Sequence, residues 1–259
     1  MISILAMVAA TAQSAELTHG ELGNTAFTIG DETLAIHPLT QPWHWGATDS
    51  IDVRFSVQSV LLPGPAASVE LAPLQTANSA LSAELGAQYE WSAGFESALK
   101  VAEQRVRPSQ SDQFAETMTQ DVSNDTFLEG TATLRASQKV AGDVYLHVSG
   151  GYAMGWLRDT WVREVPVDVA VDWRATERTM LRAALDLDAL TMGGDAPTWD
   201  TGVRWAHAWD RFRVEAGVTL QFGHLKDATI GVYEQAFLVD VPETPVIGLP
   251  YFVCWWAFR

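Results

Sequence analysis

Two pairs of polar residues in this sequence have a spacing that could support chemistry. Asp186 and Asp188 are separated by one residue, so a β-strand would place both carboxylates on one face, where they could hold a divalent cation. His147 and Ser149 share this spacing, and nucleophilic hydrolysis uses a histidine beside a serine. The ordinary interpretation of both pairs is polar residues on a wet face, with the carboxylates neutralised by an arginine such as Arg182. The sequence has no Gly-x-Ser-x-Gly, His-x-x-x-His or calcium-loop motif, so we predict no catalytic residues, no metal site, no cofactor and no enzyme activity.

Many other ionisable residues also stand at alternate positions, which a strand turns toward a single face. If that face lines a hydrated lumen, its excess of carboxylates over basic groups mildly favours cations. The candidate lumen-lining residues are Glu84, Glu96, Lys100, Arg135, Asp168, Asp172, Arg174, Arg182, Asp186, Asp188, Arg204, Arg213 and Glu215. The alternative is a network of ion pairs that fills a narrow barrel and leaves no passage.

The segments that carry these residues read as amphipathic β-strands. The stretch from Phe212 to Phe222 alternates apolar and polar residues throughout, and 81–91, 144–156, 167–174 and 181–188 repeat the pattern with no charge on the apolar face. Strands of about 9–11 residues with one apolar face are typical of transmembrane β-barrels, where a charge at the bilayer midplane costs roughly 2–4 kcal/mol. Weaker alternation at 33–38, 51–57, 67–73, 94–105, 113–121, 126–137, 199–209 and 251–258 brings the prediction to about twelve antiparallel strands, within a range of about ten to fourteen.

Connection lengths and aromatic residues support the same architecture. From residue 126 onward, short links (139–142, 175–178, 210–211) alternate with longer ones (157–165, 191–198, 223–248), as periplasmic turns and external loops do in outer-membrane barrels. The link 223–248 could fold inward, present a binding surface or form a protruding hairpin. Aromatic residues at predicted strand ends form a candidate interfacial girdle. They are Trp45, Trp91, Trp156, Trp173, Trp199, Trp209, Trp256 and Phe258.

Two short segments resemble known features of bacterial outer-membrane β-barrels. Gly46-Ala47-Thr48-Asp49-Ser50-Ile51-Asp52-Val53 resembles the G-x-T-D-x-hydrophobic-x-hydrophobic periplasmic turn of many such proteins. The segment 251–259 is similar to the aromatic closing strand that barrel-assembly machinery recognises, although it ends in Phe258-Arg259 where a terminal aromatic residue is usual. The resemblance implies a porin-like barrel in the outer membrane of a Gram-negative bacterium, with outer-membrane lipid and the assembly machinery as partners.

Composition narrows the functional classes. The chain has 259 residues and a formal net charge of −16, which opposes nucleic-acid binding. Residues 1–15 read as an export signal and 16–259 as the barrel domain, and the single Cys254 excludes an intrachain disulfide. We expect a small passive pore for an unknown solute. The alternatives are a non-conducting barrel that presents external loops, a membrane-embedded hydrolase using His147 and Ser149, or a soluble periplasmic β-sandwich or lipocalin-like barrel.

Overall fold

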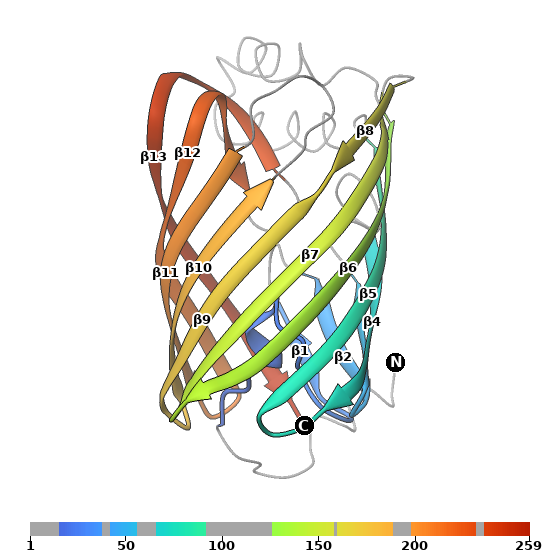
Figure 1. Ribbon diagram of the computed structural model, residues 1–259, viewed down its shortest axis with the longest axis vertical. Helices are drawn as coiled ribbons and strands as arrows, with labels where there is room; N and C mark the ends of the chain where they lie inside the picture. Colours follow the sequence, from blue (N-terminus) through green and yellow to red (C-terminus); the bar gives the residue numbers. More distant parts are fainter. Residues whose placement is uncertain are drawn as a thin grey trace, which may run out of the picture.

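Twelve antiparallel strands close into a barrel in the computed structural model (Figure 1). The described residues are 16–37, 42–55, 66–91, 126–157, 160–188, 198–231 and 236–259. The predicted export signal and the predicted strands 94–105 and 113–121 lie outside these ranges, as do Glu96 and Lys100. The strands are β1 (Leu34–Ile36), β2 (Trp43–Thr48), β3 (Ile51–Phe55), β4 (Ala66–Gln75), β5 (Ser79–Trp91), β6 (Thr126–Ala141), β7 (Val144–Leu157), β8 (Thr160–Glu164), β9 (Pro166–Thr176), β10 (Thr179–Asp188), β11 (Thr198–Trp209), β12 (Phe212–Gly231) and β13 (Ala236–Phe258).

Closure of the barrel follows from how the first and last strands pair. Apart from β8 and β9, strands that follow one another in the chain are paired, and β1 then pairs with β13, with Leu34 opposite Phe258 and Ile36 opposite Trp256. β8 and β9 follow one another along the same partner, β7, so together they occupy one position in the barrel. Every described strand except β8 has a strand neighbour on both sides, and a closed ring of this kind is the condition for crossing a bilayer with strands.

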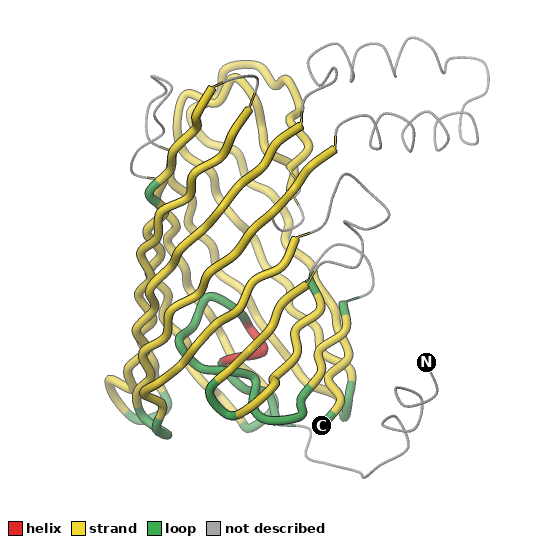
Figure 2. Tube along the Cα trace, turned by 90° about the vertical axis from the view of Figure 1, so that its right-hand side faces the viewer, coloured by secondary structure: helices red, strands yellow, loops and turns green. Residues whose placement is uncertain are grey.

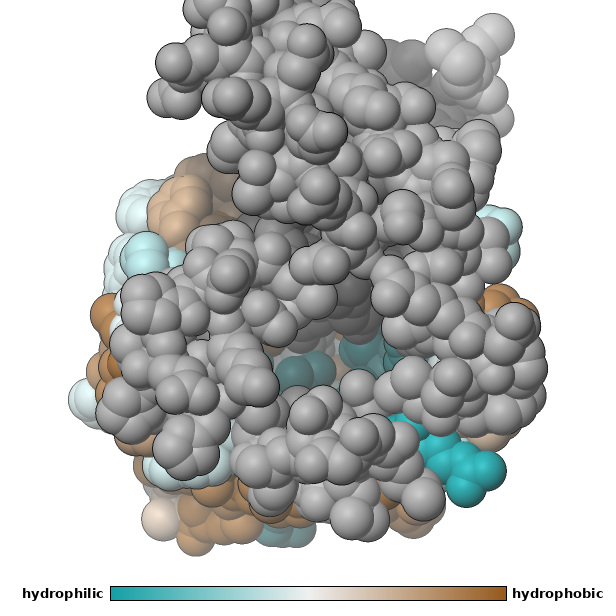
Figure 3. All heavy atoms as spheres, turned by 90° about the horizontal axis from the view of Figure 1, so that it is seen from above, coloured by the Kyte–Doolittle hydropathy of each residue, from teal (hydrophilic) through white to brown (hydrophobic). Residues whose placement is uncertain are grey.

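The outer and inner faces of the barrel carry the apolar and polar residues that the alternation in the sequence predicts. Large apolar side chains on the outer face are exposed, including Leu85 (68%), Leu134 (65%) and Val203 (65%), whereas Asp172 and Arg213 on the inner face are buried. Hydrophobic residues ring the outside in the view from above, and hydrophilic residues are visible inside the opening (Figure 3). The chain therefore has the architecture of a bacterial outer-membrane β-barrel. No helix among the described residues has the length and apolar composition to cross a membrane.

The two ends of the barrel differ. The short turns 49–50, 76–78, 142–143, 177–178 and 210–211 all lie at the lower end in Figure 1, which we call the turn end; the opposite end is the loop end. In the girdle set, Trp45, Trp173, Trp199, Trp209 and Trp256 are exposed and Phe258 is partly buried. Trp91 and Trp156 belong to β5 and β7, but their side chains are not among those described.

Four elements differ from the sequence-based strand list or extend it. β2 was not among the predicted strands, and β8 lies within the predicted loop 157–165. The connection 223–248, for which a protruding hairpin was one of three alternatives, is largely a continuation of β12 and β13, with pairs from Leu225–Thr244 to Gly231–Ala236. Register shifts at Phe222/Leu225 and Leu225/Asp227 interrupt the alternation there, which explains why a period of two could not detect it. β4 runs through Pro73, where a shift between Leu71 and Leu74 accommodates the missing backbone donor.

A segment of the chain lies inside the barrel, at a position that no local pattern in the sequence predicts. Residues 16–33, which we call the docked segment, precede β1 and sit within the lumen at the turn end (Figure 2). They contain a single turn of 3₁₀ helix, η1 (Gly20–Leu22). Leu17 and Leu22 join the buried apolar cluster of Ala35, Met180, Ala206, Ala208, Val253 and Trp255.

Candidate functional site

Close backbone contacts seat the docked segment against the barrel wall. A Cβ atom on Gly46 of β2 would lie 1.9 Å from the Gly30 carbonyl oxygen, so only glycine permits this approach. The Gly46 amide donates to the Thr33 carbonyl at 2.8 Å. Within the segment, a Cβ on Gly20 would lie 2.3 Å from the Thr28 carbonyl oxygen, so its chain folds back on itself there. The shape of the segment is therefore fitted to this position.

Arginines of the wall hold the segment by its charged and carbonyl groups. The buried Glu21 carboxylate accepts from Arg213 Nε at 2.9 Å and from Arg259 Nη2 at 2.6 Å. Arg182 Nη1 donates to the carbonyls of Leu22 (2.9 Å) and Gly23 (3.0 Å). These carbonyls end the short helix, and a guanidinium satisfies such unpaired acceptors well.

A fourth arginine, Arg174, fixes the start of the docked segment. Its Nη1 donates to Glu16 Oε1 at 2.9 Å and its Nη2 to the Leu17 carbonyl at 3.2 Å. Arg174 comes from β9, two residues from Asp172, so the same strand contacts the segment twice. The docked segment is thus anchored at both its start and its helix.

Side-chain acceptors of the wall satisfy the amides of the segment. Asp52 Oδ2 accepts from the Ile29 amide at 2.9 Å, and Ser137 Oγ accepts from the Ala26 amide at 2.8 Å. Gln75 Oε1 accepts from the Thr28 amide at 3.0 Å. A chain without strand neighbours would otherwise leave these buried donors unsatisfied, at a cost of about 1–3 kcal/mol each. The polar inner face therefore serves as the binding surface of this segment.

His19 brings a second histidine to His147 and Asp172. Asp172 Oδ2 lies 3.0 Å from His19 Nδ1 and 3.1 Å from His147 Nε2, and Arg182 binds both carboxylate oxygens at 2.7 and 2.8 Å. The His147 Nε2 atom is buried and, despite its short distance to the carboxylate, makes no hydrogen bond with acceptable angles. Burial lowers the pKa of His19, although its hydrogen bond to Asp172 acts in the opposite direction, so the imidazole is neutral at neutral pH.

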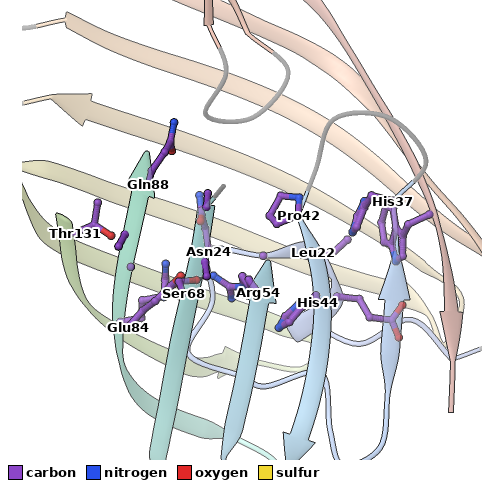
Figure 4. A pocket seen from close by; sticks show the side chains of 18 of the residues that line it. Leu22, Asn24, His37, Pro42, His44, Arg54, Ser68, Glu84, Gln88 and Thr131 are labelled. Atoms are coloured by element: carbon purple, nitrogen blue, oxygen red, sulfur yellow. Dashed lines mark hydrogen bonds and ion pairs between the residues drawn. The ribbon is translucent and has the colours of Figure 1, made fainter. Parts of the chain in front are cut away.

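A cavity of about 340 Å³ lies above the docked segment, on its loop-end side. Arg54, which projects from β3, and Glu84, from β5, point toward one another in its wall (Figure 4). Arg54 donates to Glu84 at 2.7 Å and to Glu70 at 2.6 Å, and Arg135 is ion-paired with the same two carboxylates. A second cavity, of about 660 Å³, lies at the turn end and is lined by His19, Phe27, Asp49 and Tyr145 among others. The docked segment contributes to the lining of both cavities.

A row of carboxylates crosses three strands nearer the loop end. Asp186 on β10 lies opposite Asp168 on β9 and opposite Asp200 on β11 in the strand register. All three are partly buried on the inner face, and Ser149 donates a short hydrogen bond to Asp168. Such a row concentrates negative charge on one side of the lumen.

The structure places the predicted residues as follows. Ten of the thirteen candidate lumen residues are buried or partly buried on the inner face: Glu84, Arg135, Asp168, Asp172, Arg174, Arg182, Asp186, Arg204, Arg213 and Glu215. Asp188 lies in β10 with its side chain outside the described set, and Glu96 and Lys100 lie outside the described residues. Most of the ten make ion pairs or hydrogen bonds that the sequence could not specify, such as Tyr251 donating to Glu215 at 3.1 Å.

The histidine and serine of the candidate catalytic pair have different partners, although they stand two residues apart. His147 and Ser149 are not bonded to one another, because His147 contacts Ser137 and Asp172 whereas Ser149 contacts Asp168. Ser137 Oγ, at 2.8 Å from His147 Nδ1, is buried and already accepts from the docked segment. Sequence reasoning missed His19, Glu21 and Ser137, since no local pattern relates residues 16–33 to strands more than a hundred residues away.

Comparison with known proteins adds little. No protein-family model matches the chain, and no curated protein matches it either. Solved structures that resemble it include outer-membrane expressed OmpT of Vibrio cholerae (11% identity, TM-score 0.47, covering 83% of this chain and 63% of that one). Another is an anion-selective porin from Comamonas acidovorans (10% identity, TM-score 0.47, covering 84% and 58%). The chain thus spans less than two thirds of the length of either, and at these TM-scores the resemblance says nothing about function.

Proposed function

We propose that this chain is an outer-membrane channel for small hydrophilic solutes, with a mild preference for cations, and that the docked segment closes its turn end. The observation that carries the proposal is the location of residues 16–33: they lie inside the lumen and line both a cavity toward the loop end and a cavity toward the turn end. A solute that enters from the loop end meets this segment before it reaches the turn end. Movement of the segment is therefore the gating step.

The type of contact supports a movable segment. Arg174, Arg182 and Arg213 hold it through ion pairs and hydrogen bonds, in addition to the apolar contacts of the buried Leu17 and Leu22. Polar contacts can be exchanged for water when the segment leaves, whereas the closed strand pairing of the barrel stays intact. The barrel is thus the fixed element and the segment the mobile one.

The cation preference follows from the charge on the inner face. The carboxylate row of Asp168, Asp186 and Asp200 lies on the path between the loop end and the docked segment. Negative side chains along a pore raise the local concentration of cations. The wall of the upper cavity also carries more acidic than basic side chains: Glu21, Glu84, Glu129 and Glu215 against Arg54 and Arg135.

Planar-bilayer recording tests both parts of the proposal. The wild-type chain should show rare openings, and a variant lacking residues 16–30 should conduct persistently. In a potassium chloride gradient the reversal potential should indicate cation preference, and Asp168→Asn should reduce it. Asp143→Asn, which removes a carboxylate from the exposed turn 142–143, is the matched control and should leave the reversal potential unchanged.

A non-conducting barrel that presents external loops is the second candidate. The dense anchoring of the docked segment at both its start and its helix favours it. A barrel that stays silent in bilayers after removal of residues 16–30 would favour this function over transport. Both candidates place the chain in the outer membrane of a Gram-negative bacterium, and detergent-dependent extraction with heat-modifiable gel migration tests that location.

A further inference from the structure

The geometry points to a zinc site formed by His19, His147 and Asp172, which joins the docked segment to the barrel wall. One donor atom from each of the three residues lies within 4.8 Å of the others, and all three side chains are buried. The ligands come from three separate parts of the chain: the docked segment, β7 and β9. Two imidazoles and one carboxylate are a common protein ligand set for Zn²⁺, with water in the fourth position.

The distances suit a tetrahedral ion. In such a site the bonds are about 2.0–2.2 Å long, which puts neighbouring ligand atoms about 3.3 Å apart. Asp172 Oδ2 is already 3.0 Å from His19 Nδ1 and 3.1 Å from His147 Nε2. The ligand atoms of the two imidazoles lie within 4.8 Å of one another, so a small adjustment would let one ion bind all three ligands.

An unpartnered nitrogen points to a ligand at this place. His147 is 1% exposed, and its Nε2 faces the Asp172 carboxylate without a hydrogen bond of acceptable geometry. A buried nitrogen without a well-formed hydrogen bond is unfavourable, and a metal ion would use its lone pair.

The surroundings orient the ligands as second-layer groups do in metal sites. Ser137 Oγ lies 2.8 Å from the other nitrogen of His147 and fixes the ring. Arg182 binds both oxygens of Asp172 and fixes the carboxylate, although its positive charge also weakens that ligand. The site therefore suits Zn²⁺, which takes few nitrogen and oxygen ligands, better than Ca²⁺, which takes six to eight oxygens.

The turn-end cavity reaches one of the three ligands. The cavity of about 660 Å³ is lined by His19 and by turn residues such as Asp49 and Thr76. It can admit a hydrated ion and supply the water that completes the coordination. Bound zinc would hold the docked segment in place by mass action. The binding itself does not depend on the proposed channel function, whereas its effect on gating does.

Zinc titration of the full chain, produced without a histidine tag and treated with chelator, tests the site. Competition with a chromophoric chelator should give one zinc per chain, and His19→Gln or His147→Gln should each weaken binding at least ~10-fold. His207→Gln is the matched control, because His207 lies outside the cluster between Trp205 and Trp209. His19→Gln changes no strand residue, and heat-modifiable migration checks that every variant is folded.

Two measurements distinguish metal binding by these residues from a purely structural role. Co²⁺ substitution should give the intense visible bands of a tetrahedral site in the wild type and His207→Gln but not in His19→Gln. Zinc should slow hydrogen exchange of the Ala26 amide in the wild type and not in His19→Gln. Absence of saturable binding, equal binding by all variants, or zinc binding without slower exchange would overturn the inference. If the barrel never conducts but binds zinc in this way, only the proposed channel function is refuted and the zinc site stands.

Discussion

Replacing Glu21 with glutamine isolates the contribution of the ion pairs that hold the docked segment. The Glu21 side chain is fully buried and accepts from Arg213 and Arg259, at 2.9 and 2.6 Å. Removing one partner of a buried ion pair costs about 3–5 kcal/mol, because the remaining charge is left uncompensated. Glutamine keeps the shape and one acceptor, so we take the lower end, about 3 kcal/mol. At 1.4 kcal/mol per tenfold change, the undocked population should rise ~100-fold.

Hydrogen exchange measured by mass spectrometry or NMR reads this population directly. The amides of Ala26 and Ile29 donate to side chains of the wall, so they exchange only when the segment leaves. Both should exchange ~100-fold faster in Glu21→Gln, in step with the population. Glu32→Gln is the matched control, since it makes the same chemical change at an exposed position of the same segment.

Two results would contradict this role of the ion pairs. If Ala26 and Ile29 exchange at the wild-type rate in Glu21→Gln, the ion pairs do not hold the segment. If Glu32→Gln speeds exchange equally, loss of charge and not loss of these contacts is responsible. Bilayer recordings of Glu21→Gln should show more frequent openings, and unchanged gating alongside faster exchange would show that the segment does not close the channel.

Two further changes test the packing of the segment and the apolar outer face. Gly46→Ala should cost about 1–3 kcal/mol of docking free energy, because its Cβ would meet the Gly30 carbonyl. Hydrogen exchange of the amides in the docked segment should therefore become faster. Gly130→Ala is the control and should leave the exchange rates unchanged, because nothing lies within 4 Å of its added Cβ. Leu85→Arg, in the middle of β5, should destabilise folding into lipid by about 2–4 kcal/mol, and Leu74→Arg, near the turn end, by about 1 kcal/mol or less. Urea titration in vesicles measures the free energy of unfolding of both leucine variants. Equal losses in the two would contradict the inference that Leu85 lies near the bilayer midplane and Leu74 near its edge.

The strands were predictable because a closed barrel imposes a local rule. Every second residue meets the apolar exterior, so a stretch such as 212–222 carries its sidedness in its own alternation. The prediction of about twelve antiparallel strands is confirmed. The rule failed where bulges shift the register, as beyond Phe222, and Pro73 shifts β4 in the same way.

The candidate site could not be predicted, because its contacts join residues far apart in sequence. His19 and Asp172 are separated by 153 positions, and Glu21 and Arg259 by 238. Alternation identified Asp172 and Arg213 as inward-facing but could not say that a segment before the first strand would bind them. The pairing of His147 with Ser149 was suggested by proximity along β7, whereas the partners that the structure gives them come from β6 and β9.

The position of the docked segment has a consequence for biogenesis. Residues 16–33 precede every strand, yet the four arginines that bind them come from β9, β10, β12 and the residue after β13. On the proposed outer-membrane location, this segment would cross the inner membrane well before its charged partners are available. Its burial can be completed only after β13 has paired with β1, so protection of the segment from protease would report that assembly of the barrel has finished.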